Sequence, residues 1–340
     1  MAPATLKSVL QKIAGGEELS EDEMRDALEV MTAGEANPVQ MGAFLMGLRA
    51  RGETVAEITA AAKLMRAKMV RVTVPDGAVD IVGTGGDGLN TFNVSTCAAF
   101  VAAGAGLKIA KHGNRSVSSL SGSSDVLAAL GVTLDGAKGA VERCIEEAGV
   151  GFLWAPLYHP AMRVWAPVRA ELGVRSIFNL LGPLTNPASV TRQVVGVFAR
   201  QWVEPIAHVL KNLDSEHAWV VHGHDGLDEL STTGPSSVAE LRDGTITLFD
   251  IGPEDAGLAR ASLADLKGGD AKANAAALRA VLDGKKNAYR DIVLLNAAAA
   301  LVVGGQAASL ADGVQRAAKS IDSGAAVRAL ERLIAVSGSP

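Results

Sequence analysis

The sequence predicts an α/β protein made of a small all-helical domain and a large α/β domain with a mostly parallel central sheet flanked by helices. Three observations lead to this prediction. Residues 1–70 contain only helical patterns, short apolar runs alternate with loops and helical stretches after Pro75, and no internal repeat interrupts that alternation. Strand–loop–helix alternation is typical of parallel sheets with helices on their faces.

Composition limits the classes of function. The chain has 340 residues, 48% of them hydrophobic, which suits about two domains and excludes disorder as the main state. Its net charge of −5 disfavours nucleic acid as a partner. Cys97 and Cys144 form no CxxC motif, so we expect reduced, buried thiols in a cytoplasmic protein. Residues 1–16 lack the apolar core of a signal peptide, and the charge-free stretch 292–311 is diluted by polar residues, which predicts a buried helix and no membrane span.

The helical domain is predicted from start signals. Two capping boxes, in which Ser or Thr precedes Glu by three residues, mark helix starts: Ser20 with Glu23 and Thr54 with Glu57. Pro38 occupies a first-turn position between them. Because no polar cluster accompanies these helices, we expect this region to serve structure or oligomerisation.

The large domain follows element by element. The expected strands are 78–83, 107–113, 151–155, 193–198 and 217–221, and the expected helices are 93–106, 123–130, 138–148, 202–213 and an Ala-rich group over 272–336. Asp243-Gly244 lies between alternating runs and predicts a hairpin that adds an antiparallel ribbon. The stretch 159–187 interrupts the pattern with a helix and a loop rich in Pro, Asn and Gly. If it packs on the first helices, the domains are 1–72 with about 165–187, and 73–164 with 188–340.

The first chemical signal is GTGGDGLNTFNVST at 83–96, which follows a strand and opens a helix. Glycines let backbone N–H groups approach an anion at a helix start. The spacing matches neither a P-loop nor a dinucleotide fingerprint, and a simple tight turn is the alternative. Asn93, Ser95 and Thr96 favour an anion or metal site, since capping the helix needs only one of them.

The second signal is KHGNRSVSSLSGSSD at 111–125, after the next strand. Lys111 and Arg115 supply positive charge, and the following serines supply hydroxyls. A solvated loop is the alternative. Two polar loops at one edge of a parallel sheet suit a phosphorylated ligand at the carboxyl ends of the strands.

The third signal is HGHDGLDELSTTG at 222–234. Its adjacent acids Asp228 and Glu229 suit Mg²⁺, which takes one or two carboxylates together with substrate phosphates and water. His222 and His224 would suit zinc, but no cysteine lies nearby and oxygen ligands dominate. Two solvated acids are the alternative. Together, the three loops predict a Mg²⁺-dependent enzyme that acts on a phosphorylated small molecule.

Four stretches in this order and spacing resemble the anthranilate phosphoribosyltransferases: GTGGDGLNTFNVST, KHGNRSVSSLSGSSDVLAALG, FNLLGPLTNP and DGLDELS. The resemblance covers about residues 5–335. It implies transfer of phosphoribose from 5-phosphoribosyl 1-diphosphate (PRPP) to the amine of anthranilate, in tryptophan biosynthesis. It also implies two Mg²⁺ ions per subunit and a homodimer formed through the helical domain, with no nucleic acid or membrane partner.

The resemblance also implies site residues. Catalytic roles go to Lys111, Asp228 and Glu229, and metal binding to Ser95, Asp228 and Glu229. PRPP contacts are implied for Gly83, Thr84, Gly85, Gly86, Asp87, Thr91, Asn93, Val94, Ser95, Thr96, Lys111, His112, Gly113, Asn114, Arg115, Ser119 and Ser123. Anthranilate contacts are implied for Gly83, His112, Asn114, Arg169 and Pro183. Leu120 departs from the family, many of whose members carry Lys there, so backbone contacts must suffice at that position.

Three alternatives remain open at this point. Arg169, expected to pair with the carboxylate of anthranilate, has a surface ion pair with Glu171 as its alternative role. For the whole chain, the rivals are a nucleic-acid-binding relative on the same fold and a pyrimidine nucleoside phosphorylase. The net charge argues against the first, and the acidic pair at 228–229 argues against the second, which needs no diphosphate-bound Mg²⁺.

Overall fold

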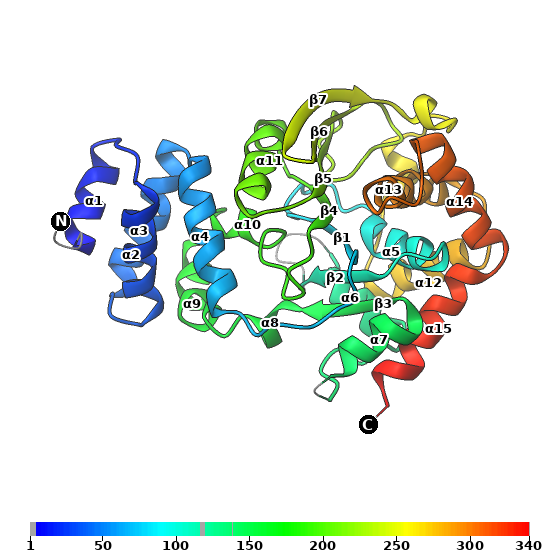
Figure 1. Cartoon of the computed structure of the whole chain (residues 1–340), viewed down its shortest axis with the longest axis horizontal. Coiled ribbons are helices and arrows are strands. Elements are labelled where there is room, and N and C mark those ends of the chain that lie inside the picture. Colours follow the sequence, from blue (N-terminus) through cyan, green and yellow to red (C-terminus); the bar gives the residue numbers. More distant parts are fainter. Residues whose placement is uncertain (1–4, 116–119, 138, 340) are drawn as a thin grey trace.

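The computed structural model describes residues 5–115, 120–137 and 139–339. A bundle of helices forms one end of the molecule, and a seven-stranded sheet covered by helices forms the rest (Figure 1). The strand order is β3-β2-β1-β4-β5-β6-β7. This arrangement confirms the predicted fold class.

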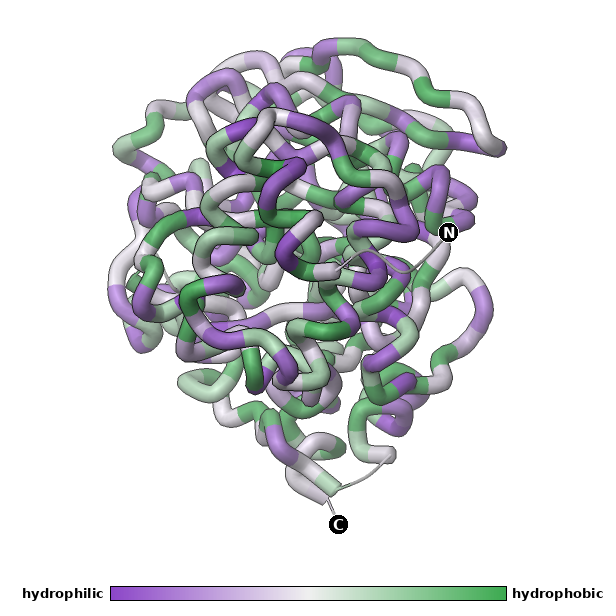
Figure 2. Tube along the Cα trace, turned by 90° about the vertical axis from the view of Figure 1, so that its left-hand side faces the viewer, coloured by the Kyte–Doolittle hydropathy of each residue, from purple (hydrophilic) through white to green (hydrophobic). Residues whose placement is uncertain are grey.

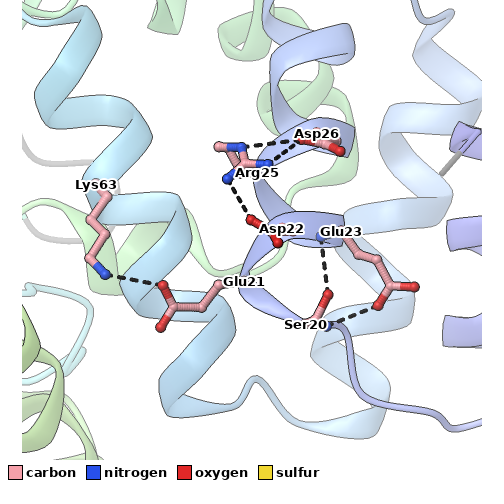
Figure 3. Close-up of polar contacts among 7 residues, drawn as sticks. All are labelled: Ser20, Glu21, Asp22, Glu23, Arg25, Asp26 and Lys63. Atoms are coloured by element: carbon pink, nitrogen blue, oxygen red, sulfur yellow. Dashed lines mark hydrogen bonds and ion pairs between the residues drawn. The ribbon is translucent and has the colours of Figure 1, made fainter. Parts of the chain in front are cut away.

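The bundle contains α1 (Leu6–Ala14), α2 (Glu21–Thr32), α3 (Pro38–Arg51) and α4 (Val55–Lys68). Both predicted capping boxes form, and Pro38 is the first residue of its helix. Figure 3 shows the reciprocal bonds of Ser20 and Glu23 and the ion pair of Lys63 with Glu21 that joins α4 to α2. Figure 2 looks onto this end of the molecule and shows green and purple segments alternating along the helices, as amphipathic helices require.

The interrupting stretch forms α8 (Ala155–Tyr158), α9 (Met162–Leu172) and α10 (Phe178–Leu181). Helix α9 contacts α2 and α3, and α10 contacts α4. Trp165 is fully buried there, and its indole N–H donates to Thr32 Oγ1 at 3.2 Å. The side chains of this stretch therefore share one apolar core with the bundle.

The sheet supplies the framework of the site. Strands β1 (Val79–Gly83), β2 (Ile109–Gly113), β3 (Val150–Trp154), β4 (Arg192–Gly196) and β5 (His217–Gly223) are parallel, and β6 (Ser236–Arg242) and β7 (Thr245–Ile251) continue antiparallel. Asp243 and Gly244 have φ of 50° and 76°, which confirms the predicted tight hairpin. The chain leads from β1 to β2 on one side and from the neighbouring β4 to β5 on the other, and ligands of open α/β sheets bind at such switch points.

Helices cover both faces of the sheet. The remaining helices are α5 (Val94–Gly104), α6 (Ser123–Ala129), α7 (Ala140–Ala148), α11 (Val203–Asn212), α12 (Ala271–Leu282), α13 (Ala288–Val303), α14 (Leu310–Asp322) and α15 (Ala325–Ser337). Three short 3-10 turns are η1 (Arg200–Trp202), η2 (Pro253–Ala256) and η3 (Leu263–Leu266). Helices α5 and α13 pack on one face, whereas α11 covers β5 and β6 and links them to α4.

The expectation of one helix through 292–311 is wrong in its extent. Helix α13 is almost wholly buried but ends at Val303, because the chain turns at Gly305 with φ of 72° before α14 begins. Across the described ranges, the helices fall short of the length and apolarity that crossing a membrane demands. Cys97 and Cys144 are free and buried, as expected.

Candidate active site

The carboxyl ends of the central strands bring the first and third chemical motifs together. The N–H of Gly85, in the loop after β1, donates to Asp228 Oδ2 at 2.6 Å. The N–H of Ser95, in the first turn of α5, donates to Glu229 Oε1 at 3.2 Å. Both adjacent acids are therefore held by the backbone of the glycine-rich loop and the helix that it opens.

Two glycines make room for Asp228. Gly83 and Gly196 are cross-strand partners at the ends of β1 and β4. A Cβ added to Gly83 would lie 2.4 Å from Asp228 Oδ2, and one added to Gly196 would lie 1.6 Å from the Asp228 carbonyl oxygen. Gly83 was among the predicted residues, whereas Gly196 was missed. Its only signal in the sequence was a glycine within an expected strand.

The acidic pair is strongly perturbed. Burial, with Asp87 nearby, raises the pKa of Asp228 to about 7, and burial together with Asp228 raises the pKa of Glu229 to about 8. Paired carboxylates that are this hard to ionise attract a cation that would offset their charges. Their hard oxygen donors fit Mg²⁺. In the described part of the chain no three His, Cys, Asp or Glu side chains form a metal-binding group, so such an ion would complete its shell with substrate and water.

The two histidines beside the acidic pair have other partners. His222 Nδ1 lies 2.7 Å from the carbonyl oxygen of Val197, and His224 Nε2 lies 3.0 Å from Ser237 Oγ. Neither histidine belongs to a group of three His, Cys, Asp or Glu side chains in the described ranges, which favours the magnesium interpretation of the acidic loop over zinc.

The second motif contributes a buried lysine. Lys111 on β2 is 3% exposed, and its Nζ donates to the carbonyl oxygen of Ile81 at 2.5 Å. Burial lowers the pKa of Lys111, while the charges of Asp80, Glu229 and Asp228 oppose that shift. The nearby acids thus favour the protonated amine, against the effect of burial.

Two further residues of the second motif, Arg115 and Leu120, are exposed. Arg115 is exposed, lies 3.8 Å from Asp125 and stacks over Trp154. The side-chain oxygen of Asn114 accepts the N–H of Arg115. Leu120 is 68% exposed, and its N–H donates to Asn90 Oδ1 at 3.3 Å, so its backbone does make a contact. The predicted Ser119 lies outside the described residues.

The side chain of Asn93 does not cap helix α5, although capping was the alternative role for the polar residues at this helix start. Asn93 occupies the N-cap position but makes no side-chain capping bond. Its oxygen instead accepts from Asn274 Nδ2 at 2.9 Å, and its amide donates to the carbonyl oxygen of Ser121 at 3.3 Å. Thr96 donates to Ser123 Oγ at 3.0 Å, which joins α5 to α6. Asn274, near the start of α12, was not predicted, because nothing in the sequence relates it to this loop.

The other predicted PRPP residues lie along the same two loops. Thr84 Oγ1 accepts the N–H of Phe198, the carbonyl oxygen of Gly86 accepts from Arg175, and Asp87 accepts the N–H of Leu89. Thr91 pairs with Lys267 in an isolated antiparallel β-bridge, and Val94 is buried. Gly113 packs against Phe152, since a Cβ added to Gly113 would lie 2.8 Å from Cε2 of that ring.

Two of the predicted acceptor residues, His112 and Pro183, meet at the turn after α10, which we call the acceptor wall. His112 Nδ1 lies 3.0 Å from the carbonyl oxygen of Gly182, and its Nε2 lies 3.2 Å from Nε2 of His159. Burial and the neighbouring His159 lower the pKa of His112 to about 3. Pro183 follows Gly182 and is buried. His159 was missed, because a lone histidine before a proline carries no pattern.

Arg169 lies on α9, within the stretch that joins these residues to the bundle. Its guanidinium lies 5.2 Å from the ring centre of Phe178, and partial burial lowers its pKa. Within the described ranges it forms no ion pair, so the alternative pair with Glu171 is absent. A desolvated guanidinium without a counter-ion suits a carboxylate ligand.

The chain matches known proteins over nearly its whole length. Residues 7–69 match the helical bundle domain, and residues 75–327 the a/b domain, of a glycosyl transferase family. An anthranilate phosphoribosyltransferase of Rhodopseudomonas palustris (strain BisB18) is 63% identical over 333 residues, 98% of each chain. The crystal structure of the Thermus thermophilus enzyme has 45% identity and a TM-score of 0.91, covering 97% of this chain and 99% of that one. The Saccharomyces cerevisiae enzyme in complex with PRPP and Mg has 32% identity and a TM-score of 0.90, covering 100% and 99%.

These likenesses extend across both domains. They agree with the geometry of the site, where the glycine-rich loop, the buried lysine and the acidic pair lie at one edge of the sheet. They decide against a nucleoside phosphorylase and against a nucleic-acid-binding relative. The chain belongs to the anthranilate phosphoribosyltransferase family.

Proposed function

We propose that this chain transfers the 5-phosphoribosyl group of PRPP to the amine of anthranilate, releasing diphosphate and forming N-(5-phosphoribosyl)anthranilate for tryptophan biosynthesis. One observation carries the proposal: Asp228 and Glu229 are held directly against the glycine-rich loop by the N–H groups of Gly85 and Ser95. A diphosphate bound at that loop would lie beside the ligands of its own metal ion.

We propose Ser95, Asp228 and Glu229 as the magnesium ligands, with two ions per subunit. Bound Mg²⁺ would neutralise diphosphate charge and stabilise it as a leaving group. The backbone of 83–87 and the first turn of α5 would hold the diphosphate through N–H groups other than those of Gly85 and Ser95, which already donate to the acidic pair. The other PRPP-binding residues are those implied by the resemblance, Ser119 included.

Lys111 would act electrostatically. Breaking the bond between C1 of ribose and diphosphate builds negative charge on the leaving oxygen, and a preorganised buried cation stabilises that charge. Lys111 meets this need because it is 3% exposed and the neighbouring acids favour its charged form. The anthranilate amine is already a nucleophile, so its positioning against C1 carries the second half of the reaction.

The acceptor would be held on the other side of the site. Arg169 would pair with the carboxylate of anthranilate, and Gly83, Asn114, His112 and Pro183 would line its pocket. The unpaired guanidinium of Arg169 beside the Phe178 ring supports this role, because anthranilate presents a carboxylate on an aromatic ring.

The remaining proposals concern organisation. We assign 1–72 with about 165–187 to the small domain, and 73–164 with 188–340 to the large domain. The shared apolar core of α9, α10 and the bundle supports this division. We further propose a homodimer formed through the helical domain, and a cytoplasmic location.

Anthranilate fluorescence tests the proposed reaction. The purified chain should remove the fluorescence of anthranilate when PRPP and Mg²⁺ are both present. The variant Asp228→Asn/Glu229→Gln should keep its fold but lose roughly a hundredfold or more in rate. The exposed adjacent acids of α7 provide the matched control, so Glu146→Gln/Glu147→Gln should leave the rate unchanged. Unchanged turnover and Mg²⁺ dependence in the first variant would contradict the metal assignment.

A further inference from the structure

The turn after α10 is tethered through its backbone carbonyls. Each carbonyl oxygen from Leu181 to Leu184 accepts a hydrogen bond from a side chain. The donors are Thr185 Oγ1 to Leu181 at 2.9 Å, His112 Nδ1 to Gly182 at 3.0 Å, Gln193 Nε2 to Pro183 at 3.0 Å and Arg66 Nε to Leu184 at 2.7 Å. Three of these donors come from three different elements: β2, β4 and α4. A proline-containing turn is thus fixed to both the sheet and the bundle.

The sheet side of this attachment is a polar pair in an apolar layer. Asp80 on β1 and Gln193 on β4 are cross-strand partners, and both are fully buried. Asp80 Oδ2 accepts from Asn186 Nδ2 at 2.7 Å, and Asp80 Oδ1 accepts the N–H of His112 at 3.1 Å. Asn186 also donates to the carbonyl oxygen of Ala110 on β2 at 2.8 Å. The turn therefore rests on a polar row that crosses β2, β1 and β4.

The exposed point of the turn is Gly182. It is surrounded in sequence by buried residues, yet a Cβ added to it would meet nothing within 4 Å. Its φ of −49° and ψ of −59° are open to any residue, so the bare backbone is not needed for conformation. The turn therefore presents bare backbone at this point, with room beside it for another group.

We propose that Gln193, together with Asp80 and Asn186, is a positioning residue that sets the acceptor wall at Gly182-Pro183 and thereby the enzyme's selectivity for the aromatic acceptor. The inference rests on the proposed function. Hydrogen bonds from the sheet keep the wall from moving to admit a bulkier ring. The rigid wall therefore selects acceptors by their shape.

Gln193 carries a mark of a functional residue. Its Oε1 is buried and has no hydrogen-bond partner in the described part of the chain. A buried acceptor without a partner costs folding free energy, so an apolar side chain of similar size would suit the sheet better. The glutamine is explained by its one bond, from Nε2 to the carbonyl oxygen of Pro183.

The test is Gln193→Met, which keeps the volume and removes both the tether and the unpartnered oxygen. We expect an unchanged or higher melting temperature. We also expect the KM for anthranilate to rise about tenfold, as loss of one positioning hydrogen bond allows, with the KM for PRPP within about twofold of its original value. The ratio of kcat/KM for anthranilate to that for a ring-methylated anthranilate should fall. Gln201→Met, at an exposed glutamine of η1, is the matched control and should change none of these values.

A second variant and a second readout keep the outcome decisive. Gly182→Ala adds one methyl group to the exposed point of the wall and should raise the anthranilate KM without moving the melting temperature. Hydrogen exchange over 177–191 should quicken in Gln193→Met, and this readout needs no turnover. An anthranilate KM and selectivity that stay unchanged, or KM values that rise equally for both substrates, would overturn the proposal. A parent enzyme that consumes no anthranilate would instead refute the proposed function, and hydrogen exchange would still report whether Gln193 tethers the turn.

Discussion

At the scale of single residues, the site is assembled from main-chain donors and glycine gaps. Asp228 occupies space that Gly83 and Gly196 leave open, and Gly85 supplies the N–H that orients its carboxylate. The burial that this close fit imposes also raises the pKa of the acid. Ionisation of the two acids is therefore unfavourable until a cation is bound. This is a usual property of sites that hold a metal ion and phosphate together.

Arg169 allows the acceptor site to be separated from the PRPP site. Arg169→Ala should weaken the use of anthranilate by roughly 2–4 kcal/mol, as expected when one partner of a desolvated charge pair is removed. The KM for PRPP should barely change, because the glycine-rich loop, Lys111 and the acidic pair are untouched. Michaelis constants for both substrates are the measurement, with exposed Arg163→Ala on the same helix as control. Equal losses for both substrates would indicate a structural role for α9 instead.

His159 should make the protein sensitive to acid. Burial lowers the pKa of His159 to about 4 and, with His159, that of His112 to about 3. Below the unfolded-state pKa of about 6.5, the unfolded chain binds more protons than the folded one, so stability falls as the pH drops towards the folded-state values. Each histidine contributes a slope of up to about 1.4 kcal/mol per pH unit. Asp80, whose pKa burial raises to about 6, acts in the opposite direction.

The comparison that isolates this effect is His159→Gln against the parent. Urea denaturation at several values between about pH 7 and pH 5 should show a shallower loss of stability in the variant, while the contribution of Asp80 stays common to both. His208→Gln, at an exposed histidine of α11, should keep the parent slope. Parallel curves for His159→Gln and the parent would show that the buried histidine pair does not govern the acid response.

At the scale of elements, the two predicted capping boxes differ in a way that the pattern does not show. Glu23 is partly exposed, whereas Glu57 is fully buried. Glu57 accepts the N–H groups of both Thr54 and Leu19 and forms an ion pair with Arg51. The second box is thus a junction between helices as well as a cap.

The same substitution at the same position of each box should therefore have different costs. Glu57→Gln should lower the free energy of unfolding by about 3–5 kcal/mol, because it leaves Arg51 without its buried partner. Glu23→Gln should cost about 0.5–1 kcal/mol, the scale of an exposed ion pair and cap. Chemical denaturation measures both, and equal losses would contradict a special role for burial at Glu57.

At the scale of the whole molecule, the helical bundle has a face that its own chain leaves open. Val39 is 80% exposed and Met46 is 38% exposed, and both lie on α3. The proposed catalytic residues, by contrast, lie at the edge of the sheet. The exposed face of the bundle is therefore available for a contact between two subunits.

The dimer proposal predicts a sedimentation result. The parent chain should sediment as a dimer at micromolar concentration, and Val39→Glu/Met46→Glu should shift it towards monomer by placing charges in the apolar contact. Leu248→Glu, on the exposed edge strand β7, should leave the dimer intact. A monomeric parent with full activity would refute the proposal, and a variant that stays dimeric would move the contact away from α3.

Sequence patterns were enough to predict the fold class, most strand and helix positions along the chain, both capping boxes and the hairpin at Asp243-Gly244, and they singled out three polar loops after strands. All of these depend on neighbours within a few positions, through periodicity, capping spacing and turn residues. The end of α13 at Val303 was not predicted, because a turn made of small residues resembles a continued helix in sequence.

The contacts of Gly196, Asp80, Asn186 and Gln193 could be found only in the folded chain. The sequence does not relate any of them to its partner, which comes from a distant segment. The acidic loop lies over Gly196, Gln193 binds the turn after α10, and Asn186 binds Asp80 on β1. Such contacts depend on which faces meet across the sheet. Local propensity carries no information about those faces, because they are set by the folding of the whole chain.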